Sequence, residues 1–191
     1  MILPIVAYGA PILRAKCSPV QKDDLALQAL LADMWETLEN ANGSGLAAPQ
    51  VNVNARIFIV NSRSSFERMD ENEKNSFRDN PGIQQAFINP HILSYEPEKN
   101  SDEEGCLSIP GIWQEVSRFS GLTMSYYDEA FRLHTKTFYD LTARMIQHEY
   151  DHIEGKLYLD YLSPLTRKLL KSKLNRIQKG EITCRYPMKF S

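Results

Sequence analysis

The stretch DLTARMIQHEYDHIEG, residues 140–155, predicts a helix that carries a metal site. His148 and His152 are four positions apart, so on a helix both imidazoles lie on one face and can reach the same ion. Glu149 lies between them, where its carboxylate can take a proton from a water at that ion. Gly155 is a residue type at which helices commonly end. We therefore expect a helix over 140–154 with a metal-ligating face.

Two histidines leave a catalytic metal site one protein ligand short, because such sites usually have three. No histidine follows His152 in the sequence. The acids that follow it are Glu154, Asp160 and Glu181. Upstream, EGCLS at 104–108 contains Cys106, whose thiolate is a good ligand for a borderline-soft divalent ion. We therefore favour Cys106 as the third ligand, with an acidic ligand as the alternative.

A third stretch, GSGLAAPQ at 43–50, consists mostly of small and turn-forming residues. It matches the dinucleotide-binding pattern GxGxxA, but that pattern requires a strand before it and a helix after it. Here a helix precedes the stretch and a buried strand over 56–60 follows it, so the pattern does not apply. We expect a loop that a ligand backbone can approach closely, ending in Gln50, whose amide can donate a hydrogen bond. An ordinary tight connection is the alternative.

Two further helices are predicted outside these motifs. The first has an apolar stripe at helical spacing, follows two candidate capping aspartates at 23–24, and stops at 42–43. The stripe consists of Leu27, Leu30, Leu31, Met34 and Leu38. The last helix should begin at Ser163 and Pro164, as cap and first helical residue, and end near Gly180.

Strands are predicted at 56–60 and 86–93, and again at 121–127 and 131–138, where the composition indicates a hairpin. The polar stretch 61–85 predicts a surface excursion, because it lacks the apolar residues for a core of its own. Since helices and strands do not alternate regularly, an α+β fold is favoured over a parallel α/β sheet.

The composition agrees with one soluble domain spanning residues 1–191. Hydrophobic residues make up 42% and charged residues 24%, which argues against disordered and fibrous proteins. A net charge of −2 argues against a protein that binds nucleic acids over its whole surface. Three cysteines are too few for a disulfide scaffold and fit a reducing compartment; apart from Cys106, Cys17 and Cys184 are expected to be structural. We find no signal peptide or membrane span, so we expect a cytoplasmic protein.

The three motif stretches together resemble the peptide deformylase family, bacterial enzymes that remove the N-formyl group from nascent polypeptides. Members of that family carry GxGxAAxQ, EGCxS and HExDH segments in this order, and here they stand complete at 43–50, 104–108 and 148–152. The resemblance covers most of the chain. It implies an α+β fold in which antiparallel strands pack around a central metal-binding helix, with a C-terminal helix, and a hydrolase that releases formate from the formyl-methionine of nascent chains.

The resemblance also implies a role for each motif residue. These roles are Gly45 against the substrate backbone, the Gln50 side chain and the Leu107 backbone N–H at the oxyanion, Cys106, His148 and His152 on the metal, and Glu149 as general base and then acid. The implied cofactor is one divalent ion, Fe²⁺ in the cell, with Ni²⁺ or Zn²⁺ as alternatives in purified protein.

Helical spacing places Leu141 and Met145 on the same face as the histidines, seven and three residues before His148. We expect them to line an apolar pocket for the methionine side chain, with Leu46 and Ile109 as further candidates. Packing in the core is the alternative for each of them.

Other residues near the motifs have expected roles. Glu104 can orient a ligand histidine, with Arg118 as its charge partner. Asp151 points away from the two histidines on the helix and is expected to form a structural ion pair. Trp113 stands where several members of the family carry an arginine, so a contact from there to the peptide backbone is not expected.

The C-terminal part of the chain is basic: residues 164–191 contain eight lysines and arginines and one acid, a charge of +7. In the resembling family a C-terminal helix docks on the ribosome, and a basic helix suits phosphate contacts with RNA. We expect weak ribosome binding through an appended helix over 164–180, and neither a membrane nor DNA as partner. A solvated helix face is the alternative.

Two other functions stay open on the sequence alone. One is an HExxH metallopeptidase with an acidic third ligand. The other is a metal-stabilised ribosome-binding module without turnover. Formate release would distinguish a deformylase from both.

Overall fold

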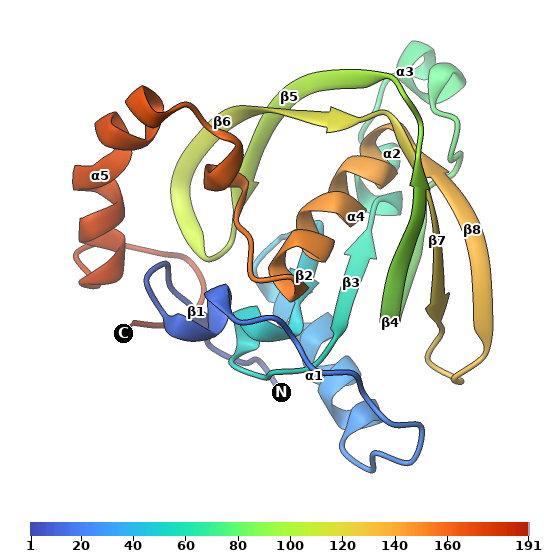
Figure 1. Cartoon of the computed structure of the whole chain (residues 1–191), viewed down its shortest axis with the longest axis horizontal. Coiled ribbons are helices and arrows are strands. Elements are labelled where there is room, and N and C mark those ends of the chain that lie inside the picture. The colour runs from blue at the N-terminus through green and yellow to red at the C-terminus, as the bar shows by residue number, and fades with distance from the viewer. Residues whose placement is uncertain (191) are drawn as a thin grey trace.

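The computed structural model describes residues 1–190 and contains a five-stranded antiparallel sheet with strand order β2-β3-β4-β7-β8. Its strands are β2 (Gly45–Ala47), β3 (Ile57–Asn61), β4 (Gln84–Tyr95), β7 (Gly121–Tyr127) and β8 (Leu133–Tyr139). The helix α4 (Asp140–Ile153) packs against β2 and β3 and lies in the middle of the molecule (Figure 1). The predicted α+β class, with antiparallel strands around a central helix, is confirmed.

A second pair of strands closes over α4. The antiparallel hairpin of β5 (Lys99–Cys106) and β6 (Ile109–Phe119) forms a separate sheet that arches over the helix (Figure 1). Cys106 is the last residue of β5, so the hairpin carries it to α4. The sequence did not predict these strands, because β5 is polar and only Glu104 in it is fully buried.

The apolar face of α4 explains its orientation. Ala143, Ile146 and Ile153 are completely buried and pack in one cluster with Phe58 and Phe87 of the sheet. Burial of each large apolar side chain stabilises the fold by about 1.5–3 kcal/mol, so this face is held against the sheet. The HEYDH histidines lie on the opposite side of the helix and are thereby turned toward the hairpin.

Two of the remaining helices, α1 and α5, lie where the sequence predicted the first and the last helix. They are α1 (Leu27–Asn40), α2 (Arg63–Glu67), α3 (Glu71–Ser76) and α5 (Pro164–Gln178), with short 3₁₀ helices η1 (Pro11–Arg14), η2 (Ala48–Val51) and η3 (Tyr158–Tyr161). In α1 four of the five stripe residues are fully buried and Leu30 is half-buried. Among residues 1–190, no helix has the length and apolarity needed to cross a membrane.

The predicted caps have different outcomes. The Ser163 hydroxyl accepts the Thr166 N–H at 3.1 Å and Pro164 is the first residue of α5, as expected. The aspartate caps of α1 are wrong: Ala26 occupies the cap position without a side-chain hydrogen bond. The Asp24 carboxylate instead accepts the N–H of Ala26 at 2.9 Å, because the chain makes a separate turn before the helix begins.

The helix α5 is more firmly joined to the body than an appendage would be. Its Leu170, Leu174 and Ile177 are buried in a cluster with Ile112 and Val116 of β6. The chain then continues to β9 (Met188–Lys189), which pairs in parallel with β1 (Ile5–Val6). The sequence indicated no such pairing, because two-residue strands have no detectable periodicity.

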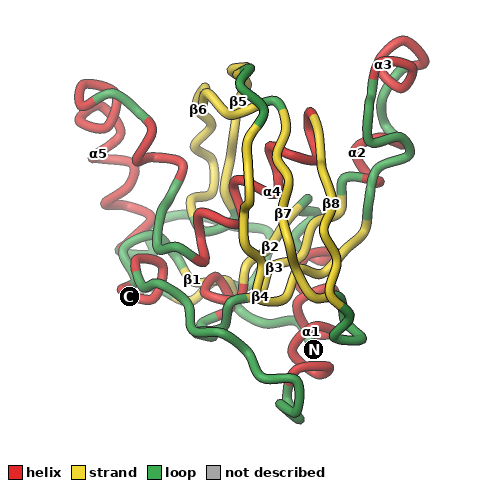
Figure 2. The backbone as a smooth tube through the Cα atoms, turned by 45° about the vertical axis from the view of Figure 1, so that its right-hand side comes forward, coloured by secondary structure: helices red, strands yellow, loops and turns green. Residues whose placement is uncertain are grey.

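Two of the predicted loops contain regular structure. The 43–50 stretch includes the edge strand β2, whose small residues pair with β3. The excursion at 61–85 contains α2 and α3, which project from the body of the molecule at one edge of the sheet (Figure 2). Neither helix has a buried residue, which agrees with the expectation that this segment has no core.

Candidate metal centre

The three predicted metal ligands lie together. His148 and His152 extend from α4 and Cys106 from the end of β5, and one ligand atom of each lies within 4.8 Å of the others. The Cys106 Sγ is 3.3 Å from His152 Nε2. Both histidines and the cysteine are at least half-buried, so a cation here would be held by these side chains within the protein.

The acidic alternatives for the third ligand are engaged elsewhere or lie apart. Glu154 forms ion pairs with Arg56 and Lys16 at 2.5 and 3.0 Å. Asp160 pairs with Arg14 at 2.6 Å. Glu181 is exposed beyond α5. Cys106 is therefore the ligand that the fold brings to the histidines.

The two histidines differ in their hydrogen bonds and in the direction of their pKa shifts. The Glu104 carboxylate lies 3.0 Å from Nδ1 of His148. Since a carboxylate only accepts, Nδ1 carries a hydrogen, which leaves Nε2 as the atom that could bind a metal. Burial lowers the pKa of His152 well below its usual value, and the neighbouring His148 lowers it further, so His152 is neutral. Burial by itself would lower the pKa of His148, but its contacts with Cys106 and Glu104 raise that pKa well above its usual value, so a cation bound by His148 would displace a proton. With a cation bound, one thiolate and two neutral imidazoles would form a donor set that fits a transition-metal ion.

Glu104 is the centre of a buried ionic network. Its Oε1 accepts from Arg118 Nε at 2.9 Å and Arg144 Nη1 at 2.8 Å, and its Oε2 from Arg118 Nη2 and His148 Nδ1, both at 3.0 Å. The sequence predicted the partners His148 and Arg118. It missed Arg144, which reaches Glu104 from four residues before His148 and had no motif to indicate it.

The charge state of Glu104 follows from these contacts. Burial by itself would raise its pKa, but the hydrogen bonds from His148 and Arg118 outweigh burial and lower the pKa to about 2. A folded-state pKa below the ordinary 4.5 means that the ionised carboxylate stabilises the fold above pH 4.5. That contribution is lost as the pH falls toward about 2.

Asp151 extends the network away from the metal ligands, as predicted from its place on the helix. Its Oδ2 lies 2.5 Å from Arg118 Nη1, and its Oδ1 accepts from the Tyr161 hydroxyl at 3.0 Å. Arg118 thus bridges Glu104 of the hairpin and Asp151 of α4, which ties the two elements together.

Glu149 lies beside the ligand cluster with one oxygen free. Its side chain is buried, and Oε2 has no hydrogen-bond partner. Burial raises the pKa of Glu149 to about 7, although the neighbouring His148 opposes the shift. A Cβ added at Gly45 would lie only 2.8 Å from Cδ of Glu149, so the glycine makes room for this carboxylate. A carboxylate with a pKa near neutrality is suited to accept and return a proton.

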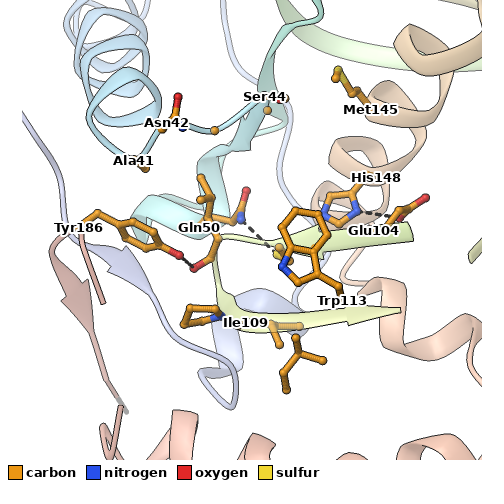
Figure 3. A pocket seen from close by; sticks show the side chains of 18 of the residues that line it. Ala41, Asn42, Ser44, Gln50, Glu104, Ile109, Trp113, Met145, His148 and Tyr186 are labelled. Atoms are coloured by element: carbon orange, nitrogen blue, oxygen red, sulfur yellow. Dashed lines mark hydrogen bonds and ion pairs between the residues drawn. The ribbon is translucent and has the colours of Figure 1, made fainter. Parts of the chain in front are cut away.

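Gln50 has a fixed orientation at the same site. Its Oε1 accepts the Ala47 N–H at 2.8 Å, so Nε2 points the other way, 3.3 Å from Ser108 Oγ and 3.6 Å from Cys106 Sγ. Figure 3 shows the Gln50 side chain extending into the pocket, on the side of Trp113 and His148. The side chain therefore offers an N–H donor next to the metal ligands.

These groups open onto a cavity of about 600 Å³. Ile109, Leu141 and Met145 line it together with Gly45 and Leu107. The prediction for Leu46 is wrong: this residue of β2 is completely buried in the core and does not border the cavity. Successive residues of a strand point to opposite faces, so Gly45 facing the cavity turns Leu46 away from it.

Two further parts of the lining were not anticipated. Trp113 is 62% exposed at the cavity and lies over Gly105, where an added Cβ would be 2.9 Å from its indole ring. Residues 183–186 after α5 also line the cavity, and among them is Cys184, which the sequence assigned a structural role. Cys17, the other cysteine outside the motifs, is buried in the core as expected.

We predict that Glu104→Gln lowers the affinity for a divalent metal by about 10- to 100-fold, because the amide no longer holds the ligand nitrogen of His148 in place. Affinity can be measured by competition with a coloured chelator. Glu103→Gln is the matched control, since Glu103 is the exposed neighbour on the same strand. Equal affinities of the two variants would contradict the orienting role of Glu104.

Comparison with known proteins agrees with this site. Residues 2–168 match the family model of polypeptide deformylase. The chain is 46% identical to peptide deformylase from Christiangramia forsetii, over its whole length and 96% of that protein. It is 45% identical to peptide deformylase from Cytophaga hutchinsonii, over its whole length and 98% of that protein. It is similar to the crystal structure of a peptide deformylase from Legionella pneumophila, with TM-score 0.78 and 33% identity, covering 95% of this chain and 98% of that one. The chain therefore belongs to the polypeptide deformylase family, the metal-dependent hydrolases that remove the N-formyl group from nascent peptides.

Proposed function

We propose that Cys106, His148 and His152 hold one divalent cation and that Glu149 moves the proton during deformylation. The observation that carries this assignment is the meeting of three ligand atoms within 4.8 Å beside a buried carboxylate oxygen without a partner. A cation bound there would act as a Lewis acid and make water acidic enough to react at neutral pH. We further propose that the ion in the cell is Fe²⁺, because the thiolate and imidazole donors favour transition metals over Mg²⁺ or Ca²⁺ and the family resemblance implies iron.

Glu149 performs both proton transfers in this assignment. Its Oε2 accepts a proton as water adds to the formyl carbon, and it returns that proton to the amine nitrogen as the carbon–nitrogen bond breaks. Formate and a free N-terminal amine result. The elevated pKa of Glu149 suits this double role, because the carboxylate takes and releases the proton near neutral pH.

Gln50 and Leu107 provide the donors for the negative charge that develops on the formyl oxygen. The Gln50 amide is oriented by Ala47, and Leu107 lies in the turn that follows Cys106. Donors that are already oriented stabilise such a charge without reorganisation, and the loss of one typically costs about 3 kcal/mol of barrier.

We predict that Glu149→Gln lowers kcat by about 10²- to 10⁴-fold while metal remains bound, because only proton transfer is removed. Cys106→Ala should lose the metal, and Cys17→Ala, which removes a thiol from the core, should keep it. The assay is formate release from a formyl-Met peptide, with metal analysis on anaerobically prepared protein, where we expect iron. Cleavage of internal peptide bonds would instead indicate a metallopeptidase, and a metallated but inert wild type would indicate a binding module.

The apolar part of the cavity is proposed as the pocket for the methionine side chain. Ile109, Leu141 and Met145 line it from the hairpin and from α4. Leu141 and Met145 lie about two turns and one turn before His148 on the same helix, so a side chain next to the formyl group would meet them.

Met145→Ala should reduce the preference for formyl-Met over formyl-Ala peptides by about tenfold, because the enlarged pocket no longer fits the thioether chain closely. The measurement is the ratio of kcat/KM for the two peptides. Met69→Ala is the control, since Met69 lies in the excursion outside the cavity. An unchanged ratio in Met145→Ala would exclude this residue from the pocket.

We also propose weak ribosome association through α5, which would place the enzyme in the cytoplasm next to its nascent-chain substrates. The basic residues of α5 are exposed, while its apolar face is buried against β6. A chain truncated before α5 would also lack β9 and would expose Ile112 and Val116 of β6, so a truncated chain is a poor test of binding.

Charge reversal leaves this packing intact. Lys168→Glu with Lys171→Glu should weaken ribosome binding and lower the slope of log affinity against log salt concentration by about two, since each lost phosphate contact contributes about 0.9. The matched control is Lys22→Glu with Lys156→Glu, which changes the net charge equally on exposed sites outside α5. Equal binding by both double variants, measured by co-sedimentation, would contradict a role for α5.

A further inference from the structure

The chain beyond α5 forms part of the active-site wall. After Gln178 it turns back, and Thr183, Cys184, Arg185 and Tyr186 line the cavity before β9 joins β1. Figure 3 shows Tyr186 across the cavity from His148. This segment lies outside residues 2–168, the part that matches the family model.

Tyr186 makes one specific contact with the catalytic part of the site. Its hydroxyl donates a hydrogen bond to the Leu107 carbonyl oxygen at 2.8 Å, and its ring is half-buried against the core. Burial raises the pKa of Tyr186 well above its usual value, so the hydroxyl keeps its proton and continues to donate.

Leu107 needs such a contact because the strand ladder does not hold it. Cys106 pairs with Ile109, which leaves Leu107 and Ser108 as the turn between β5 and β6. The Ser108 carbonyl accepts the Tyr8 N–H at 2.8 Å, and Tyr186 holds the carbonyl of Leu107. The N–H and the carbonyl of Leu107 are separated by only two soft dihedral angles, so fixing one end restricts the direction of the other.

We propose that Tyr186 is a positioning residue for deformylation, which holds the turn at Leu107 so that its N–H stays directed at the formyl oxygen. The inference rests on the oxyanion role proposed for Leu107. Tyr186 itself touches no reacting atom. Its effect is exerted through the backbone of Leu107, at the moment when charge develops on the substrate oxygen.

Tyr186→Phe tests this role, because the ring and its packing stay and only the hydroxyl is removed. We expect kcat to fall about tenfold, less than the 10²- to 10³-fold loss typical of deleting an oxyanion donor, since the N–H is still present but less well directed. The inhibition constant of the deformylated product peptide should change less than twofold, because that peptide has no formyl oxygen. Metal content should equal that of the wild type.

Tyr8→Phe is the matched control. Tyr8 lies next to the same turn and is half-buried, but its hydroxyl has no hydrogen-bond partner among the described residues, so its kcat should stay at the wild-type value. A wild-type kcat in Tyr186→Phe would overturn the proposal. A loss of kcat accompanied by an equal loss of product binding or of metal would also overturn it, since that pattern indicates a structural role alone. If the wild type released no formate, the proposed catalytic roles themselves would fail, which separates the two outcomes.

Discussion

The hydrogen bond between Glu104 and His148 is the interaction on which the metal centre depends. Glu104 belongs to the hairpin and His148 to α4, so the bond both sets the tautomer of a ligand and fixes the distance between two elements. Arg118 repeats the connection by pairing with Glu104 and with Asp151. Cys106 is two residues beyond Glu104 on the same strand, so this connection also determines where the thiolate meets the histidines.

Such a network is stable only when it is complete. Transfer of charged groups from water into the protein interior is unfavourable, and removal of one partner from a buried ion pair costs about 3–5 kcal/mol. Glu104 meets this condition because both of its oxygens accept two hydrogen bonds, from Arg118, Arg144 and His148. The arrangement gives positional precision rather than net stability, which suits a site where ligand geometry controls the chemistry.

The rest of the site is formed by the sheet and α4 on one side and by the C-terminal segment 183–186 on the other. Glu149 of α4 lies where Gly45 leaves room for its carboxylate, and the Gln50 amide is oriented by the Ala47 N–H. The C-terminal segment closes the cavity from the other side and reaches Leu107 through Tyr186. The central elements therefore carry the candidate site, while the end of the chain contacts one of its turns.

The sequence by itself determined the central helix, the three motifs and the apolar stripe of α1, and it favoured Cys106 over an acid as third ligand, because each depends on local spacing or on the chemistry of one side chain. It also indicated the partners Glu104 and Arg118. It could not show the β5–β6 hairpin, whose first strand is polar, or the role of Arg144, which follows no motif. The burial of Leu46 and the return of Tyr186 to the site were decided only by the tertiary structure. Both depend on which face of a strand meets which neighbour, and on contacts between residues nearly eighty positions apart, which no local pattern encodes.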